Sequence, residues 1–377
     1  MKRRKVLLLG KKRVMELLVH INKRIKSRPK IQLPVEALLL QYQDPAAVTF
    51  VTNFTILYIK MGYPRMTVEK QAELAPTLVQ CLEGKPMAQQ DSLLQLLIPA
   101  LYKVQYPPDA DKRKCMFGLS EKPATVKMLL NFMMDYLLLP YTFSSTPQDR
   151  PTTAAAPEPP GAVGGQSRSR PSSAPAASTA TTVPGLSQNN VKQLLGDTIP
   201  NPEHIEKNKV GVIGFLGADI LPPQDVVCHL IVGSSDSRYS VATAADLQLK
   251  SMQSGIDWND IVIIKKMYSI FQGSVVVKGQ NLQIKPEDRR MPASTRIRMK
   301  LFPFLMKSRA VADEFPSCIQ IIFDCLFGTN TNAKLRINAV QFVHHVCVSC
   351  TDAKVTPMGP VLLLGMMKLI AEAKEVS

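Results

Sequence analysis

The chain has 377 residues, of which 45% are hydrophobic and 20% charged, and a formal net charge of +16. That apolar content can bury a sizeable core, and the length allows two or three domains. No apolar run approaches the ~18–20 residues of a membrane span, since the strongest candidate, Met128–Leu139, contains Asn131 and Asp135. No secretory leader is recognisable. The seven cysteines are scattered, which indicates reduced thiols in the cytosol or nucleus.

The positive charge is concentrated at the N-terminus. Residues 1–30 hold twelve Lys/Arg residues and one acid, a net charge of +11, which leaves +5 for the other 347 residues. We treat residues 1–10 as a basic arm, in which Lys2–Lys5 has the composition of a nuclear-import or polyanion-binding sequence. The high isoelectric point is therefore mostly a property of one end of the chain.

The first predicted helix, Val14–Lys26, has two distinct faces. Five apolar residues recur at helical spacing: Val14, Leu17, Leu18, Ile21 and Ile25. Three basic residues lie elsewhere on it: Lys23, Arg24 and Lys26. We interpret this segment as the first helix of an array, with a solvated basic outer face. The alternative is docking to a membrane surface or a nucleic acid, although residues 1–41 contain no aromatic side chain to stack on bases.

One helical sequence pattern occurs four times along the chain. Each copy opens with a residue whose side-chain oxygen can cap a first turn, followed by an apolar residue three or four positions on. The copies are Asp44–Val48, Asp236–Tyr239, Ser294–Arg298 and Asn332–Arg336. The last copy continues as an apolar stripe of Leu335, Ala339, Phe342 and Val346. Such a unit cannot bury its own apolar face, whereas stacked neighbours can.

A second helix precedes most copies, and it usually begins with a proline. Proline is tolerated there because the N–H that it lacks would have no hydrogen-bond acceptor within the first helical turn. Examples are Pro34 before Val35–Gln41, Pro222 before Asp225–Val232, and Pro316 before Cys318–Phe327. Ser294 and Asn332 are 38 residues apart, close to the ~40–47 residues of a HEAT repeat. The sequence therefore predicts an all-α fold, an α-solenoid of HEAT-like helix pairs.

The chain divides into three regions after its arm. Residues 11–143 form a helical block, residues 144–188 a disordered insert rich in Ser, Thr, Ala, Pro and Gly, and residues 189–377 a second helical block. Further helices are expected at Ala46–Lys60, Val68–Leu82, Ala88–Val104 and Ala124–Leu139. Gly273–Lys285 has the β-branched composition of a small hairpin. Pro360 is expected to open Val361–Ala373, half of a last repeat.

Two motifs raise the possibility of a metal or nucleotide site. His344, Cys347 and Cys350, beside His345, have the spacing of zinc ligands on a helix. No second ligand pair accompanies them, so we interpret them as packing residues and expect no metal. The glycines of 211–217 (GVIGFLG) resemble a phosphate-binding turn but lack the preceding strand that a dinucleotide site requires. We therefore expect no cofactor, no catalytic residues and no enzymatic activity.

The predicted insert contains one candidate modification site. Arg168 and Arg170 stand four and two positions before Ser172, a basic pattern that favours phosphorylation of Ser169, Ser172 or Ser173. The added phosphate would change the charge of a segment that has no packed structure of its own.

Long stretches of this sequence resemble one known family, the very large HEAT-repeat proteasome adapter and scaffold proteins. The resemblance is carried by residues 14–34, 41–54, 61–64, 234–249, 256–259 and 327–347. It covers most of residues 11–377 and corresponds to the N-terminal part of a family protein that is several times longer. Residues 1–10 depart from the family, and residues 144–188 match it least.

The resemblance implies a non-enzymatic scaffold that binds core and regulatory particles of the 26S proteasome. It also implies links to endosomes, endoplasmic reticulum, centrosome, motor and vesicle proteins, and a role in protein quality control in the cytoplasm and nucleus. A karyopherin-type transport receptor is an alternative solenoid, but it should be strongly acidic to hold basic cargo. A polyanion or membrane-surface binder is the other alternative and would depend on the N-terminal arm.

Overall fold

The computed structural model describes residues 2–28, 30–44, 49–141, 194–196, 200–272, 295–328 and 331–374. All regular secondary structure in these ranges is helical. The predicted disordered insert, the predicted hairpin at 273–285 and the three candidate phosphorylation serines lie outside the described residues. The division into two blocks with an insert between them stays a prediction.

Most of the helices follow one another with short connections. In the N-terminal half they are α1 (Lys2–Ser27), α2 (Val35–Gln43), α3 (Thr49–Gly62), η1 (Tyr63–Arg65), α4 (Val68–Glu73), α5 (Ala75–Gln80), α6 (Met87–Leu101), α7 (Ala110–Met116) and α8 (Pro123–Leu137). In the C-terminal half they are α10 (Pro202–Leu216), α11 (Pro223–Ser234), α12 (Tyr239–Met252), η2 (Gln253–Gly255), α13 (Ile261–Gln272), α14 (Thr295–Leu305), α15 (Val311–Glu314), η4 (Phe315–Cys318), α16 (Ile319–Phe327), α17 (Ala333–Ser349) and α18 (Asp352–Lys374).

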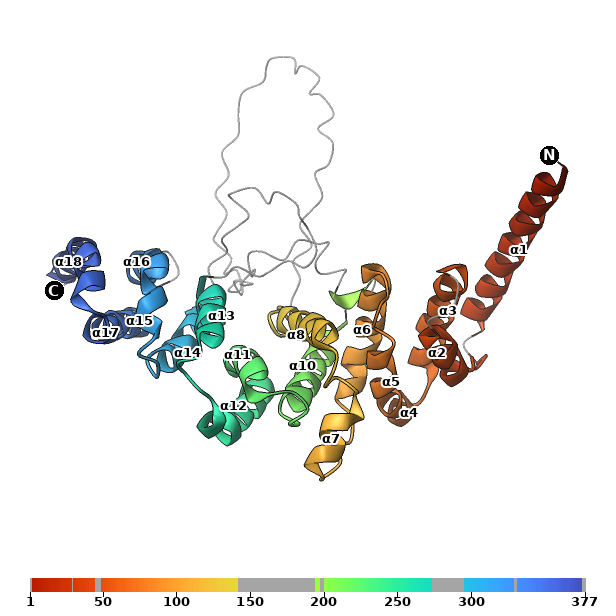
Figure 1. The fold of residues 1–377 in the computed structure, drawn as a ribbon, viewed down its shortest axis with the longest axis horizontal. Coiled ribbons are helices and arrows are strands. Elements are labelled where there is room, and N and C mark those ends of the chain that lie inside the picture. The colour runs from red at the N-terminus through yellow and green to blue at the C-terminus, as the bar shows by residue number, and fades with distance from the viewer. Residues whose placement is uncertain are drawn as a thin grey trace, which may run out of the picture.

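These helices stack into a curved array with α1 at one end and α18 at the other (Figure 1). Helices adjacent in sequence pack as pairs, including α2 with α3, α11 with α12, and α16 with α17. α10 packs on α6 and α8, so the helices before residue 142 and after residue 199 share one core. That core extends from Val35 to Leu362. The predicted all-α solenoid is confirmed.

Prolines and capping side chains set many of the helix starts, as the sequence predicts. Pro34 and Pro222 precede the first residues of α2 and α11, and Pro123 and Pro202 occupy the first turns of α8 and α10. The Asn332 side chain accepts a hydrogen bond from the backbone N–H of Leu335 at 2.8 Å. The cap predicted for the fourth copy of the pattern is therefore confirmed.

Two predictions in the N-terminal half are wrong. The single helix expected at Val68–Leu82 is divided at Leu74 into α4 and α5, because Pro76 cannot donate the backbone hydrogen bond that a continuous helix needs. The short helix α7 was missed. Its start is marked by Asp109, whose carboxylate accepts from the backbone N–H of Lys112 at 2.9 Å, a capping signal present in the sequence.

The predicted stripe of the last copy forms the buried face of α17. Leu335, Ala339, Phe342 and Val346 are each at most 1% exposed. The Phe342 ring lies 5.4 Å from the Phe302 ring of α14 and 5.8 Å from the Phe315 ring of η4, centroid to centroid. Aromatic pairs at these distances contribute beyond their buried area, so α17 is held to two neighbouring elements at one point.

The last helix, α18, is longer than expected. It begins at Asp352 and runs through Pro357 and Pro360, so the prediction that Pro360 starts this segment is wrong. An 18-residue window within 352–372 has a mean hydropathy of 1.3, which makes α18 the one helix in the described ranges that is long and apolar enough to cross a membrane. Met358 and Leu362 nevertheless lie in the array's core, and Gly365 lies against the Phe323 ring of α16.

A neutral histidine joins two helices in the middle of the core. His229 of α11 is 1% exposed, and its Nε2 donates to the Leu130 carbonyl of α8 at 2.9 Å. Burial, with a smaller contribution from the Lys266 cation, lowers its pKa from 6.5 to about 3. At pH values between these two pKa values, His229 therefore binds a proton in the unfolded chain but not in the folded chain.

This difference predicts that acid weakens the fold. Because the folded pKa is the lower one, stability is lost as the pH falls below about 6.5, and at about pH 5 His229 should cost about 2 kcal/mol of unfolding free energy. Urea unfolding at a series of pH values measures this loss. His229→Gln should remove that part of the pH dependence, while His204→Gln at an exposed position of α10 should leave it unchanged; equal slopes in both variants would contradict the assignment.

Candidate interaction surfaces

The histidine and cysteine residues of α17 are not gathered into a site. His344 and Cys347 are exposed on the outer face of the helix. Cys350 is half-buried with its Sγ 3.5 Å from the Ala312 carbonyl, and His345 Nε2 is 2.8 Å from the Ser308 carbonyl. No group of three potential ligands occurs in the described part of the chain. The packing interpretation holds for Cys350 but is wrong for His344 and Cys347, because the buried face of α17 is already filled by other side chains.

The outer face of α17 is instead a partly apolar surface. Ile337, Val340 and Val348 are 57%, 36% and 73% exposed. Their spacing places them on the same side of the helix as His344 and Cys347. The sequence analysis identified only the stripe that faces the core. An apolar stripe on the outer face has the same helical period, so the period alone does not distinguish a buried stripe from an exposed one.

The glycine motif lies inside a helix and not in a phosphate-binding loop. Gly211 and Gly214 fall within α10, and Gly217 is its C-cap. A Cβ on Gly211 would stand 2.5 Å from the backbone nitrogen of Tyr102, at the end of α6. The absence of a side chain at Gly211 therefore permits close packing of α10 on α6, in agreement with the prediction that no nucleotide binds through this motif.

A buried ion pair lies where several elements meet. Lys209 of α10 is 2% exposed, and its Nζ is 2.8 Å from Asp236 Oδ2 and 2.7 Å from the Leu139 carbonyl. Asp236 Oδ1 accepts from the Tyr141 hydroxyl at 2.7 Å and from the Arg238 backbone N–H at 2.8 Å. The Lys209 ammonium also stands 4.4 Å from the centre of the Tyr141 ring. We call these residues the Asp236 network.

The electrostatics of this network follow from burial. Burial lowers the pKa of Lys209, and the nearby Asp236 carboxylate opposes that change. Burial and the same carboxylate raise the pKa of Tyr141. The network thus keeps the Tyr141 hydroxyl protonated as a donor, while the carboxylate accepts hydrogen bonds from several directions.

The Asp236 network corrects one sequence prediction. Asp236 was expected to cap the following helix, but α12 begins at Tyr239 after Arg238 and has no side-chain cap. The Asp236 carboxylate is engaged by Lys209, and its backbone carbonyl accepts from Arg296 of α14 at 2.7 Å. Tyr141 immediately precedes residues 142–193, and α14 immediately follows residues 273–294. Tyr141 and Arg296, which lie next to these two segments in the sequence, are therefore both hydrogen-bonded to Asp236.

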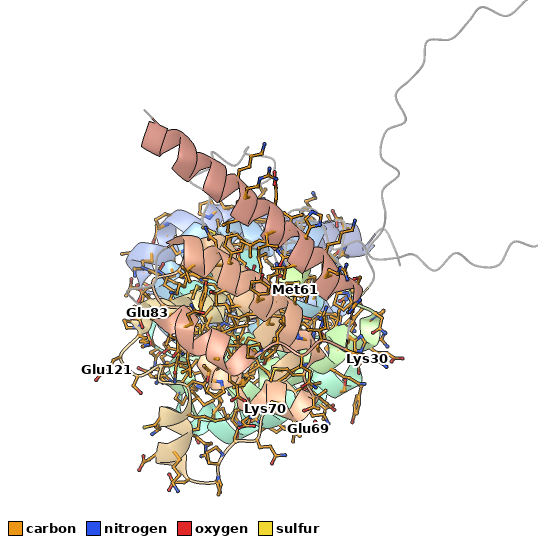
Figure 2. All side chains as sticks on the ribbon, turned by 90° about the vertical axis from the view of Figure 1, so that its right-hand side faces the viewer. Lys30, Met61, Glu69, Lys70, Glu83 and Glu121 are labelled. Carbon is orange, nitrogen blue, oxygen red and sulfur yellow. The ribbon has the colours of Figure 1, made fainter. Side chains whose placement is uncertain are left out.

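A shallow hollow of about 430 Å³ near α6 and α8 has both acidic and apolar lining. Its rim includes Glu83 and Glu121, which lie close together in Figure 2. Lys122 Nζ is 2.6 Å from a Glu83 oxygen. The hollow contains no nucleophile with an adjacent base and no ligand cluster, so nothing in it indicates a reaction.

Helix α1 projects from the array and leaves most of its apolar stripe exposed. Figures 1 and 2 show it projecting beyond the remaining helices. Of its predicted stripe only Ile25 is buried, while Val14, Leu17 and Ile21 are 50%, 58% and 38% exposed. The interpretation of α1 as a helix packed through its stripe with only its basic face solvated is therefore wrong, because none of the described elements covers most of that stripe.

Comparison with known proteins places this array in a family. The family profile described as "Proteasome component ECM29, N-terminal" matches residues 10–377. The chain belongs to the ECM29 family. Residues 1–9 of this ECM29-family chain lie outside the match, as the sequence analysis expects for the arm.

Two relatives support the assignment. A human protein named proteasome adapter and scaffold protein ECM29 is 52% identical over 380 residues, covering 97% of this chain and 19% of the human protein. A Drosophila melanogaster protein named proteasome-associated protein ECM29 homolog is 33% identical over 359 residues, covering 95% of this chain and 17% of that protein. The chain thus spans less than a fifth of the length of these ECM29 relatives. No solved structure matches it significantly.

The glycine packing of this ECM29-family chain is testable with a matched pair. Gly211→Ala should lower the unfolding free energy by about 1–3 kcal/mol, because its Cβ would meet backbone atoms that cannot yield. Gly214→Ala, in the same helix but with nothing within 4 Å of its Cβ, should be neutral or stabilising by up to about 1 kcal/mol. Chemical denaturation measures both, and equal effects would refute the close approach.

The Asp236 network yields a second prediction. Asp236→Asn leaves the Lys209 cation buried without its counter-charge and should destabilise the fold by about 3–5 kcal/mol. The control is Asp246→Asn, which breaks a 3.2 Å pair with Lys300 that is about 40% exposed and should cost about 0–1 kcal/mol. A loss for Asp236→Asn no larger than that for the control would show that the buried pair does not support the structure.

Proposed function

We propose that this chain acts as a non-enzymatic adapter that binds the 26S proteasome. The observation that carries the proposal is its membership of the ECM29 family, whose human and fly members are named for association with the proteasome. The architecture is compatible with this role, because stacked helix pairs present an extended surface for protein partners. Among the described residues, no three His, Cys, Asp or Glu side chains are grouped so that they could hold a metal ion.

The same family membership leads us to propose a wider adapter role. We infer that the chain helps to link proteasomes to endoplasmic reticulum, endosomes and the centrosome, and to motor and vesicle proteins, in protein quality control. The cytoplasm, the nucleus and the surfaces of these organelles are the corresponding locations. The exposed apolar side chains of α17 and α18 offer protein-binding area that is independent of the basic arm.

Affinity purification of the full chain from cell lysate, followed by mass spectrometry, tests the proposal. A variant lacking residues 1–13 is the matched comparison, since it removes the whole basic arm and leaves the helices that follow α1. Proteasome subunits should be recovered with both proteins. The recovery should change little with added salt, because contacts made by the repeats depend less on screened charges.

Two results would overturn the proposal for this chain. One is the absence of proteasome subunits from both purifications. The other is recovery that is lost with residues 1–13 and falls steeply with salt, which would indicate nonspecific adhesion of the arm to polyanions.

A further inference from the structure

Most of the apolar stripe of α1 is left uncovered by the part of the chain that the structure describes. Val14, Leu17 and Ile21 are 50%, 58% and 38% exposed, whereas Ile25 is only 8% exposed. The last turn of α1 is fixed to the array, because the Arg65 guanidinium donates to the Ile25 carbonyl at 3.0 Å. The stripe is therefore buried at Ile25 and becomes exposed toward the N-terminal part of α1, which projects away from the other helices (Figure 1).

The charges around this stripe are of one sign. Residues 10–30 contain eight Lys/Arg residues and a single acid, Glu16. Arg24 follows Leu17 by seven residues and Ile21 by three, so it borders the stripe, while Lys12 and Lys23 share the opposite face. All three basic side chains are exposed. The helix thus combines an aliphatic face and a basic border with an outer face that carries Lys12 and Lys23 beside Val19, which is 62% exposed.

We propose that α1 is a docking helix for anionic membrane surfaces. A basic helix of this kind lies in the interface of a bilayer, with its aliphatic face among the upper acyl chains and its Lys/Arg residues among acidic headgroups. Long basic side chains beside the stripe can keep their charge at headgroup level while their methylenes enter the apolar layer. An anionic bilayer thereby satisfies both the exposed stripe and the uncompensated positive charge.

Nucleic acid satisfies only one of these features. Phosphates would pair with the basic residues, but Leu17 and Ile21 would remain in water, and residues 1–41 have no Phe, Tyr or Trp side chain to stack on a base. The proposal does not depend on the proteasome contact, because the stripe lies at the end of the array and outside the α17 and α18 surfaces.

Vesicle flotation with the full chain tests this inference. Vesicles of phosphatidylcholine mixed with phosphatidylserine should bind the chain, and vesicles of phosphatidylcholine alone should bind it weakly. Replacing Leu17 and Ile21 together by Glu should reduce binding to the mixed vesicles about tenfold or more, because it removes apolar area and adds repulsion. Replacing Lys23 and Arg24 by Glu should reduce it and weaken its salt dependence.

The matched control replaces Leu40 and Leu57 by Glu. These leucines of α2 and α3 are 66% and 44% exposed, so the charge change is the same at equally solvated sites outside α1. The control should bind mixed vesicles as the unaltered chain does. Thermal unfolding followed by circular dichroism should be alike for the control and the stripe variant, which shows that lost binding does not reflect lost folding.

Several outcomes would overturn the inference. These are no binding of the unaltered chain to mixed vesicles, equal binding to both vesicle types, or equal losses in the stripe variant and the control. Binding to duplex DNA or RNA that competes with the vesicles and is unchanged by the stripe substitutions would assign α1 to nucleic acid. A lysate protein captured through the stripe, without vesicle binding, would assign it to a protein groove. Proteasome recovery by the stripe variant reports separately on the adapter proposal.

Discussion

The close approach of α10 to α6 is the constraint on which the continuity of this array depends. These two helices are separated in sequence by residues 142–193, yet Gly211 brings their backbones together without an intervening side chain. Apolar surface on both sides then merges into one core. A bulkier residue at this point would separate the helices and expose apolar area on each, because neither half can cover its own end.

The buried polar groups complement this apolar contact. Lys209 and Asp236 are too deeply buried to be solvated, so their mutual attraction and their hydrogen bonds offset the loss of water. His229 avoids the same cost by remaining neutral. The two arrangements affect the fold differently. The buried ion pair fixes the relative position of Lys209 and Asp236, whereas the buried neutral histidine makes the folded state less stable in acid.

The two proposals assign partner recognition to different parts of the outer surface. The helix faces of the array offer extended, moderately apolar area that suits protein partners, in keeping with the ECM29 family. Helix α1 offers a narrow aliphatic stripe within strong positive charge, which suits an anionic interface. If both proposals hold, one chain would carry a proteasome contact and a lipid contact on separate elements, so that neither competes for the other's residues.

The sequence by itself determined the helical fold, the prolines and caps that start many helices, and the buried stripe of α17, because these depend on local hydrogen bonds and on a period of 3.6 residues. The long stretches of sequence that resemble the family also predicted family membership. Only the tertiary structure decided which polar groups are buried and which apolar stripes are left open. Asp236 has the local pattern of a cap, yet Lys209 reaches it from 27 residues away. The apolar stripes of α1 and α17 have the same period. Among the described helices, neighbours cover the stripe of α17 but leave most of the α1 stripe exposed, because the period of a stripe does not determine which element packs against it.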